Sequence, residues 1–158
     1  TRRQLVIGSG LVLIAGASTG YALFKEPAYS SPVFAQDGLA IRGTDPVAYF
    51  TDKKPIQGTS EHYLEWNGAK WQFASAEHLK LFSDNPKKYA PAYGGYCAWA
   101  VAEKSELFST QPVNWAIVDD RLYLNYNDAI QERWNADIAN FIKLGDKNWQ
   151  QIVQQFEV

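Results

Sequence analysis

The chain has 158 residues, with 15 lysines and arginines against 17 aspartates and glutamates, and a formal net charge of −2. It carries no basic stripe, so we do not expect nucleic acid, which binds through its phosphates, as a partner. A single cysteine, Cys97, excludes an intramolecular disulfide, and the fold must therefore be stabilised by packing.

The first 24 residues predict a membrane anchor. The stretch from Leu5 to Phe24 has no charged side chain and follows Arg2 and Arg3. A helix of about 20 residues reaches ~30 Å, the thickness of the hydrocarbon core of a bilayer. The positive-inside bias then places the N-terminus in the cytoplasm. We therefore expect the rest of the chain on the extracytoplasmic side of the membrane, periplasmic or lumenal.

The same region resembles an export signal. Residues 1–6 are similar to the twin-arginine signal, in which two arginines precede a mildly apolar run. A signal-peptidase cut after Ala35 is the alternative to a retained anchor, and we favour the anchor. Residues 25–38 contain prolines and show no apolar periodicity, so we expect an extended tether there. The globular domain is then expected over residues 39–158.

Two β-hairpins are predicted inside that domain. In the first, Asn67 and Gly68 form the dipeptide that favours a type I′ turn between alternating segments. In the second, residues 119–121 connect two further apolar segments and contain no glycine. The four strands are expected at His62–Trp66, Ala69–Phe73, Trp115–Val118 and Leu122–Tyr126.

Short helices are predicted around the hairpins. Ser75 is a suitable N-cap for a helix that ends at Asn85-Pro86. Asn127 can cap a second helix, which continues through Trp134. Residues 138–156 have a helical apolar pattern that is interrupted at Gly145-Asp146, which predicts two or three short helices in all. The fold class expected is α+β, with small antiparallel hairpins packed with short helices.

Five segments in family order resemble the YHS domain family. The resemblance covers about residues 39–155 and continues past the helix segments, as in longer exported members with a C-terminal extension. The segments that carry it are Asp45–Phe50, Trp71–Phe82, Asn85–Tyr89, Tyr93–Ala98 and Leu122–Asn127.

The resemblance implies a metal site, and the sequence departs from it. Compact members of the family occur beside copper and other heavy-metal transporters, and they use cysteines after Asp-Pro-Val and around the start of the Phe-x-Ser helix. Here those positions carry Ala48, Ala74 and, in the helix, Glu77 and His78. Only Cys97, His78 and His62 remain as nitrogen or sulfur ligands, and copper or zinc would need all three to converge. The alternative is a buried structural cysteine, a helix histidine and a solvent-facing strand histidine.

Aromatic residues near a Gly-Gly bend form the remaining candidate site. They either line a partner or ligand pocket or belong to the core, and the sequence leaves both open. The residues are Tyr93, Tyr96, Trp99 and Trp115.

No nucleophile motif, metalloprotease motif or phosphate loop is present, so we do not expect an enzyme. The hypothesis is a non-catalytic, membrane-tethered extracytoplasmic domain of the YHS type that binds a metal or a small ligand. The alternative is an accessory subunit of a membrane protein complex, with other membrane subunits as its partners.

Overall fold

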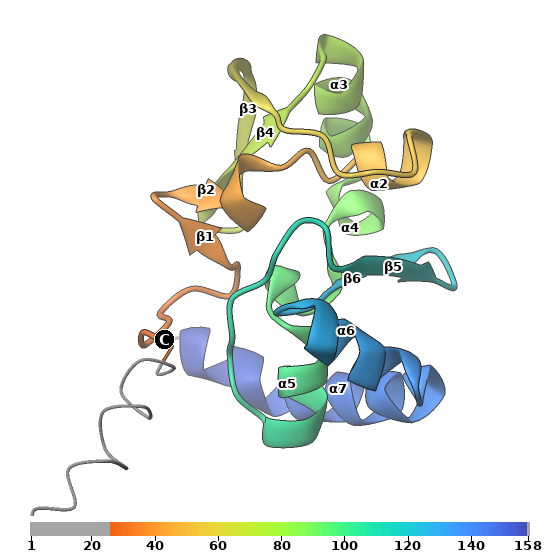
Figure 1. The fold of residues 1–158 in the computed structure, drawn as a ribbon. Helices are drawn as coiled ribbons and strands as arrows, with labels where there is room; N and C mark the ends of the chain where they lie inside the picture. Colours follow the sequence, from red (N-terminus) through yellow and green to blue (C-terminus); the bar gives the residue numbers. More distant parts are fainter. Residues whose placement is uncertain (1–25, 158) are drawn as a thin grey trace, which may run out of the picture.

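The structure is a computed structural model that describes residues 26–157. The expected membrane segment, Leu5 to Phe24, lies outside these residues. Within 26–157, no helix combines the length and the apolar character that crossing a bilayer requires. The described chain forms two lobes, residues 35–89 and residues 92–157 (Figure 1).

The first lobe is built on a four-stranded sheet with the order β1-β2-β4-β3. Strands β3 and β4 form an antiparallel hairpin, whereas β2 pairs parallel to β4 and antiparallel to β1. The elements of this lobe are β1 (Ala35–Gln36), β2 (Leu39–Ala40), the 3₁₀ turn η1 (Ile41–Gly43), α2 (Ala48–Thr51), β3 (Thr59–Trp66), β4 (Ala69–Phe73), α3 (Ala76–Asp84) and α4 (Pro86–Tyr89).

The turn between β3 and β4 has the predicted conformation. Asn67 and Gly68 have φ angles of 52° and 79°, both in the left-handed region that a type I′ turn requires. Trp66 pairs with Ala69 directly beside the turn. The first predicted hairpin is therefore confirmed, and β3 begins three residues earlier than expected, at Thr59.

The helix after β4 is capped and packed as the sequence indicates. The hydroxyl of Ser75 accepts a hydrogen bond from the backbone N–H of His78, and the helix ends at Asp84. Phe82, fully buried, packs against Trp71 and Phe73 at ring-centroid distances of 5.2 and 5.1 Å. The aromatic residues of β4 thus bind α3 to the sheet.

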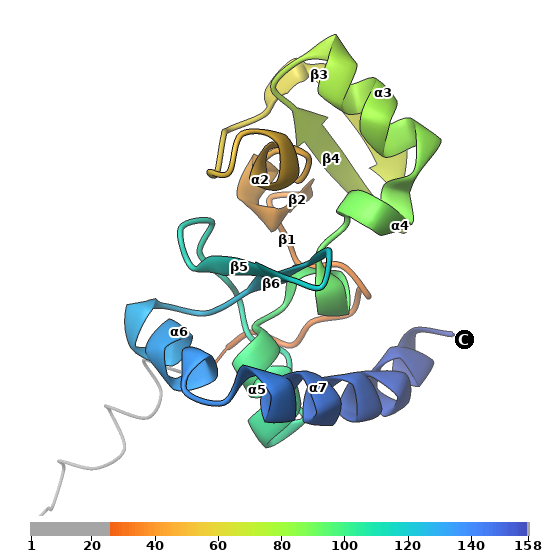
Figure 2. The same ribbon diagram turned by 90° about the vertical axis from the view of Figure 1, so that its right-hand side faces the viewer.

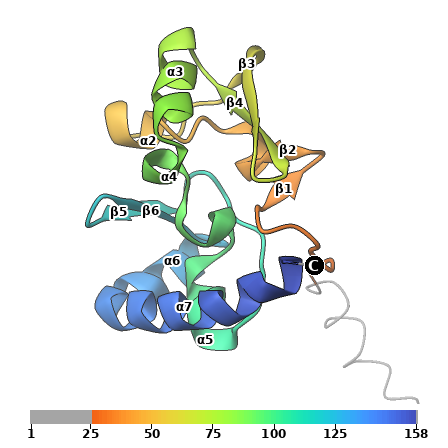
Figure 3. The same ribbon diagram turned by 180° about the vertical axis from the view of Figure 1, so that it is seen from behind.

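The second lobe is mainly helical. Its helices lie on one side of the hairpin β5-β6, which separates them from the first lobe (Figures 2 and 3). The elements are η2 (Ala92–Gly95), α5 (Ala98–Lys104), β5 (Trp115–Val118), β6 (Arg121–Leu124), α6 (Asp128–Asn135), α7 (Ile138–Val153) and η3 (Gln154–Phe156).

Two boundaries in this lobe differ from the prediction. The β5-β6 turn contains only Asp119 and Asp120, with φ angles of 49° and 59°, so Arg121 belongs to the strand. Helix α7 runs without a break through Gly145, where we expected an interruption. A Cβ at Gly145 would lie 2.5 Å from the Tyr93 hydroxyl. This glycine therefore permits close packing of α7 on η2 and does not end the helix.

The segment before β1 is extended, but it is packed onto the domain. Val33 and Phe34 are only 1% and 3% exposed, and Phe34 donates its backbone N–H to the carbonyl of Gly94. The Glu26 carboxylate accepts hydrogen bonds from the backbone N–H and the hydroxyl of Ser109. The boundary that we placed at residue 39 therefore does not separate a free tether from the core, because apolar side chains upstream of it are buried.

Replacing Gly68 with valine should lower the free energy of unfolding by about 1–2 kcal/mol. The open space around this position removes any steric clash with neighbours, so the effect comes from forcing a β-branched residue to positive φ. Urea denaturation measures the change. The control Asn67→Gly keeps positive φ accessible and should change stability by less than about 0.5 kcal/mol. Equal stability of both variants would contradict the type I′ turn.

Candidate functional site

A buried carboxylate joins three segments of the first lobe. Asp45 has no exposed surface, and its Oδ1 accepts the backbone N–H of Val47 at 2.9 Å and that of Ala48 at 3.4 Å. Its Oδ2 accepts the backbone N–H of Ala74, just after β4, at 2.9 Å. Asp45 therefore orders the start of α2 and ties it to the end of the central hairpin.

His78 completes this arrangement from α3. Its Nδ1 lies 2.6 Å from Oδ2 of Asp45, and its side chain is 14% exposed. The opposite nitrogen, Nε2, lies 3.2 Å from the Thr51 hydroxyl and 3.5 Å from a carboxylate oxygen of Asp52. The bond to Asp45 fixes the ring, so that Nε2 faces the end of α2.

The groups around Asp45, which we call the Asp45 junction, occupy the place of the metal site that the family resemblance implies. The positions where thiolates are expected, Ala48, Ala74 and His78, converge in space, but each directs a polar group at the Asp45 carboxylate. A backbone N–H has no lone pair to offer a cation, and a soft metal requires three or four sulfur or nitrogen ligands. The donor set at this junction does not fit a soft metal ion.

The three sequence candidates for metal binding are not brought together. Cys97 directly precedes α5 in the second lobe, whereas His78 lies on α3 and His62 on β3 in the first lobe. Within residues 26–157, no group of three or more His, Cys, Asp and Glu side chains is placed to hold a metal ion. His62 is half-buried within β3 and does not lie at the exposed strand end that we expected.

Cys97 has a structural environment. It is 1% exposed, and its Sγ donates to Oδ1 of the fully buried Asn125 at 3.6 Å. Burial raises the pKa of the Cys97 thiol to about 11, so the thiol is neutral at physiological pH. This agrees with the structural alternative that the sequence left open for this residue.

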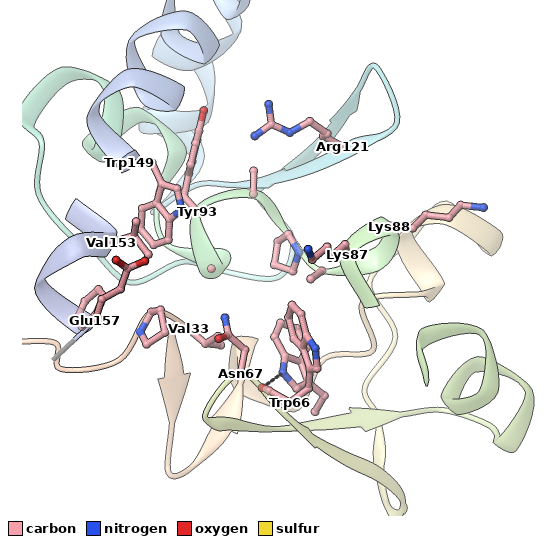
Figure 4. Close-up of a pocket in the computed structure, with 17 residues that line it drawn as sticks. Val33, Trp66, Asn67, Lys87, Lys88, Tyr93, Arg121, Trp149, Val153 and Glu157 are labelled. Carbon is pink, nitrogen blue, oxygen red and sulfur yellow. Dashed lines mark hydrogen bonds between the residues drawn. The ribbon is translucent and has the colours of Figure 1, made fainter. Parts of the chain in front are cut away.

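A groove of about 620 Å³ lies between the lobes (Figure 4). The first lobe supplies one wall with two indole rings, and the second lobe supplies the other with an indole and a phenol. Val33, from the packed N-terminal segment, also contributes. The side chains that define its character are Trp66, Trp71, Lys87, Tyr93, Arg121 and Trp149.

Polar contacts hold the second-lobe wall in place. Two guanidinium nitrogens of Arg121 donate to the Asp146 carboxylate at 3.0 and 3.1 Å, and the Tyr93 hydroxyl donates to the same carboxylate at 3.0 Å. Burial, with the nearby charge of Asp146, raises the pKa of Tyr93 well above its ordinary value. Tyr93 therefore stays a neutral hydrogen-bond donor that links η2 to α7.

The four aromatic candidates from the sequence do not form one pocket. Tyr93 lines the groove, and Trp99 lines a separate cavity of about 220 Å³ beside Cys97. Tyr96 is a core residue whose hydroxyl donates to the carbonyl of Ser31, and Trp115 packs against Tyr49 at a ring-centroid distance of 5.2 Å.

Sequence analysis missed the groove residues Trp66, Lys87, Arg121 and Trp149. They are far apart along the chain, and only Lys87 lies in a segment that carries the family resemblance, at a variable position of Asn-Pro-x-x-Tyr. The only available signal was the concentration of tryptophan in the globular part, which does not distinguish a groove from a core.

Comparison with known proteins assigns most of the first lobe. Residues 47–93, from the start of α2 to Tyr93, match the sequence model of the YHS domain, and this segment of the chain belongs to the YHS domain family. No match was found among curated proteins or among solved structures. The matched segment contains the partners of Asp45 and one wall of the groove.

Replacing Asp45 with asparagine should lower the free energy of unfolding by about 3 kcal/mol. An amide cannot accept all four hydrogen bonds, because its NH₂ group would face donors, and buried donors would lose their partner. Chemical denaturation monitored by tryptophan fluorescence gives the value. The matched control is Asp52→Asn, whose carboxylate is 39% exposed, with an expected change below about 1 kcal/mol. Equal losses in both variants would count against a central role for Asp45.

Proposed function

We propose that this protein is a non-catalytic binding module, in which the groove between the YHS lobe and the second lobe takes a small organic ligand with an apolar body. The observation that carries the proposal is the groove itself, which has aromatic walls from both lobes (Figure 4). Its volume of about 620 Å³ lies in the usual range for small-molecule pockets.

The aromatic rings determine the body of the ligand. The half-buried rings of Trp66, on the YHS lobe, and Trp149, on the second lobe, face the groove. The buried rings of Trp71 and Tyr93 support them at ring-centroid distances of 6.0 and 5.9 Å. Aromatic faces supply a large contact area at a small cost in side-chain entropy, because each ring has only two rotatable bonds. A flat apolar or aromatic body suits these walls.

Charged groups at the two ends of the groove give the ligand a direction. Lys87 and Arg121 line one end and Glu157 the other, while the Lys88 ammonium points away from the cavity (Figure 4). Asp146 engages two of the five N–H donors of Arg121, which leaves three for a ligand. The ligand therefore carries its negative group at the Lys87 end only.

The chemistry of the lining supports a binding role over a catalytic one. No histidine, cysteine, serine or threonine is among the residues that line the groove in the described part of the chain. His78, the histidine held by a carboxylate, directs Nε2 toward Thr51 and Asp52. Neither Thr51 nor Asp52 lines the groove, so the Thr51 hydroxyl is not placed to attack a groove ligand.

The proposal retains the membrane anchor from the sequence. Leu5 to Phe24 would hold the module on the extracytoplasmic side, and the packing of Val33 and Phe34 would keep it close to the membrane surface. The accessory-subunit role remains the alternative. Co-purification with a larger membrane assembly in mild detergent, without ligand binding in the groove, would favour that alternative.

The probe 8-anilinonaphthalene-1-sulfonate, an aromatic anion, should bind the folded protein saturably with one dominant site. Lys87→Gln should weaken binding about 5- to 10-fold, because one charge-assisted hydrogen bond is lost. Val153→Phe, which narrows the groove, should weaken it further. Fluorescence titration gives the dissociation constants. The control Lys143→Gln, with the same charge change on the exposed face of α7, should bind like the original protein. Equal binding by all four proteins would reject the groove as the site.

Trypsin added outside intact spheroplasts should cut the anchored protein at the exposed Lys53-Lys54 loop. The reason is the predicted orientation, with Arg2 and Arg3 in the cytoplasm and the domain outside. Immunoblotting of the fragments measures the cut, with a cytoplasmic protein as the control for intact cells. Cleavage only after the cells are opened would show that the domain faces the cytoplasm.

A further inference from the structure

The second lobe contains a separate cavity of about 220 Å³, which we call the Cys97 pocket. It lies among α5, the loop that precedes β5, and the start of α6. Cys97 and Ala100 line its buried part. Its remaining lining residues are Trp99, Lys104, Phe108, Tyr126, Asn127, Ile130 and Arg133. None of them lines the groove between the lobes.

The buried part of the pocket is held rigidly by Asn125. Its Oδ1 accepts the Cys97 thiol at 3.6 Å and the backbone N–H of Trp99 at 3.1 Å, and its Nδ2 donates to the Gln131 side chain. The backbone N–H of Cys97 also donates to the carbonyl of Phe108. These bonds hold the start of α5 against Asn125 and against the loop at Phe108. The shape of the cavity is therefore fixed before any ligand binds.

The walls are aromatic. Phe108 and Tyr126 meet edge to face at a ring-centroid distance of 5.9 Å, and Trp99 lines the pocket with them. An apolar cavity of about 150 Å³ is large enough for benzene. At about 220 Å³, the Cys97 pocket therefore accommodates one six-membered ring with a small substituent.

Two cations border the pocket, and no carboxylate from the described part of the chain lines it. The Lys104 ammonium lies 5.9 Å from the Trp99 ring centroid and 5.7 Å from that of Phe108, and the Arg133 guanidinium lies 5.6 Å from that of Trp99. Cation–π contacts thus hold both charges beside the walls. Within residues 26–157, neither cation forms an ion pair.

We propose that the Cys97 pocket is a second binding site that takes a small aromatic monocarboxylate. The ring lies among Trp99, Phe108 and Tyr126, and the carboxylate faces Lys104 and Arg133 in charge-assisted hydrogen bonds. The thiol at the base of the pocket is neutral at pH 7, because burial raises its pKa to about 11, and it therefore does not repel the anion. This site is independent of the proposed groove, since the two share no lining residue.

The test is a titration of the isotope-labelled protein with benzoate at pH 7, followed by NMR chemical shifts. Saturable shifts are expected at Trp99 and Ala100. Benzamide, which has the same ring without the charge, should bind at least 5-fold more weakly. Lys104→Gln and Arg133→Gln should each weaken benzoate several-fold and leave benzamide unchanged. Lys143→Gln, an exposed cation outside the pocket, is the matched control and should have no effect.

A further variant tests whether the aromatic ring of the ligand lies inside the Cys97 pocket. Ile130→Phe fills the pocket and should abolish the binding of both benzoate and benzamide, while the spectrum of the rest of the protein reports that the fold is kept. Absence of saturable shifts, equal affinity for benzoate and benzamide, or shifts confined to the groove residues would each overturn the proposal. If 8-anilinonaphthalene-1-sulfonate does not bind in the groove, the benzoate titration still tests the Cys97 pocket on its own.

Discussion

The YHS lobe depends on one interaction, the hydrogen bonding of the buried Asp45 carboxylate. Its two oxygens hold the start of α2, the end of β4 and the first turn of α3, through three backbone N–H groups and His78. A buried charge is tolerated only with such partners, and the donors in turn would be unsatisfied without it. Where the family resemblance implies thiolates around a metal ion, this chain joins the same positions, Ala48, Ala74 and His78, by hydrogen bonds to a carboxylate.

In the function that we propose, the second lobe completes a ligand groove on this YHS unit. The matched segment supplies one wall of the groove and ends at Tyr93 in the other wall, which Arg121, Trp149 and Phe156 complete. Gly145 lets α7 approach η2 closely enough for this wall to form. The ligand site that we propose is therefore a property of both lobes together, as is common for pockets at the junction of two packed units.

The two cavities differ in size and in charge, so they suit different ligands. The groove contains both signs of charge, with Lys87 toward one end and Glu157 toward the other, and is large enough for a multi-ring molecule. The Cys97 pocket accommodates a single ring, and its charged lining residues within 26–157 are Lys104 and Arg133. Ligand binding at the groove therefore does not imply ligand binding at the Cys97 pocket, and the reverse also holds.

The sequence by itself determined the features that depend on a few neighbouring residues: the type I′ turn at Asn67-Gly68, the N-cap at Ser75 and the YHS segment. These follow from local backbone preferences and short motifs. Only the tertiary structure decided that Gly145 continues a helix, that Val33 and Phe34 are core residues, and that Cys97 and His78 lie in different lobes. The physical reason is that cavities, ion pairs and burial arise where distant segments pack together, and packing over such separations leaves no pattern within a short stretch of sequence.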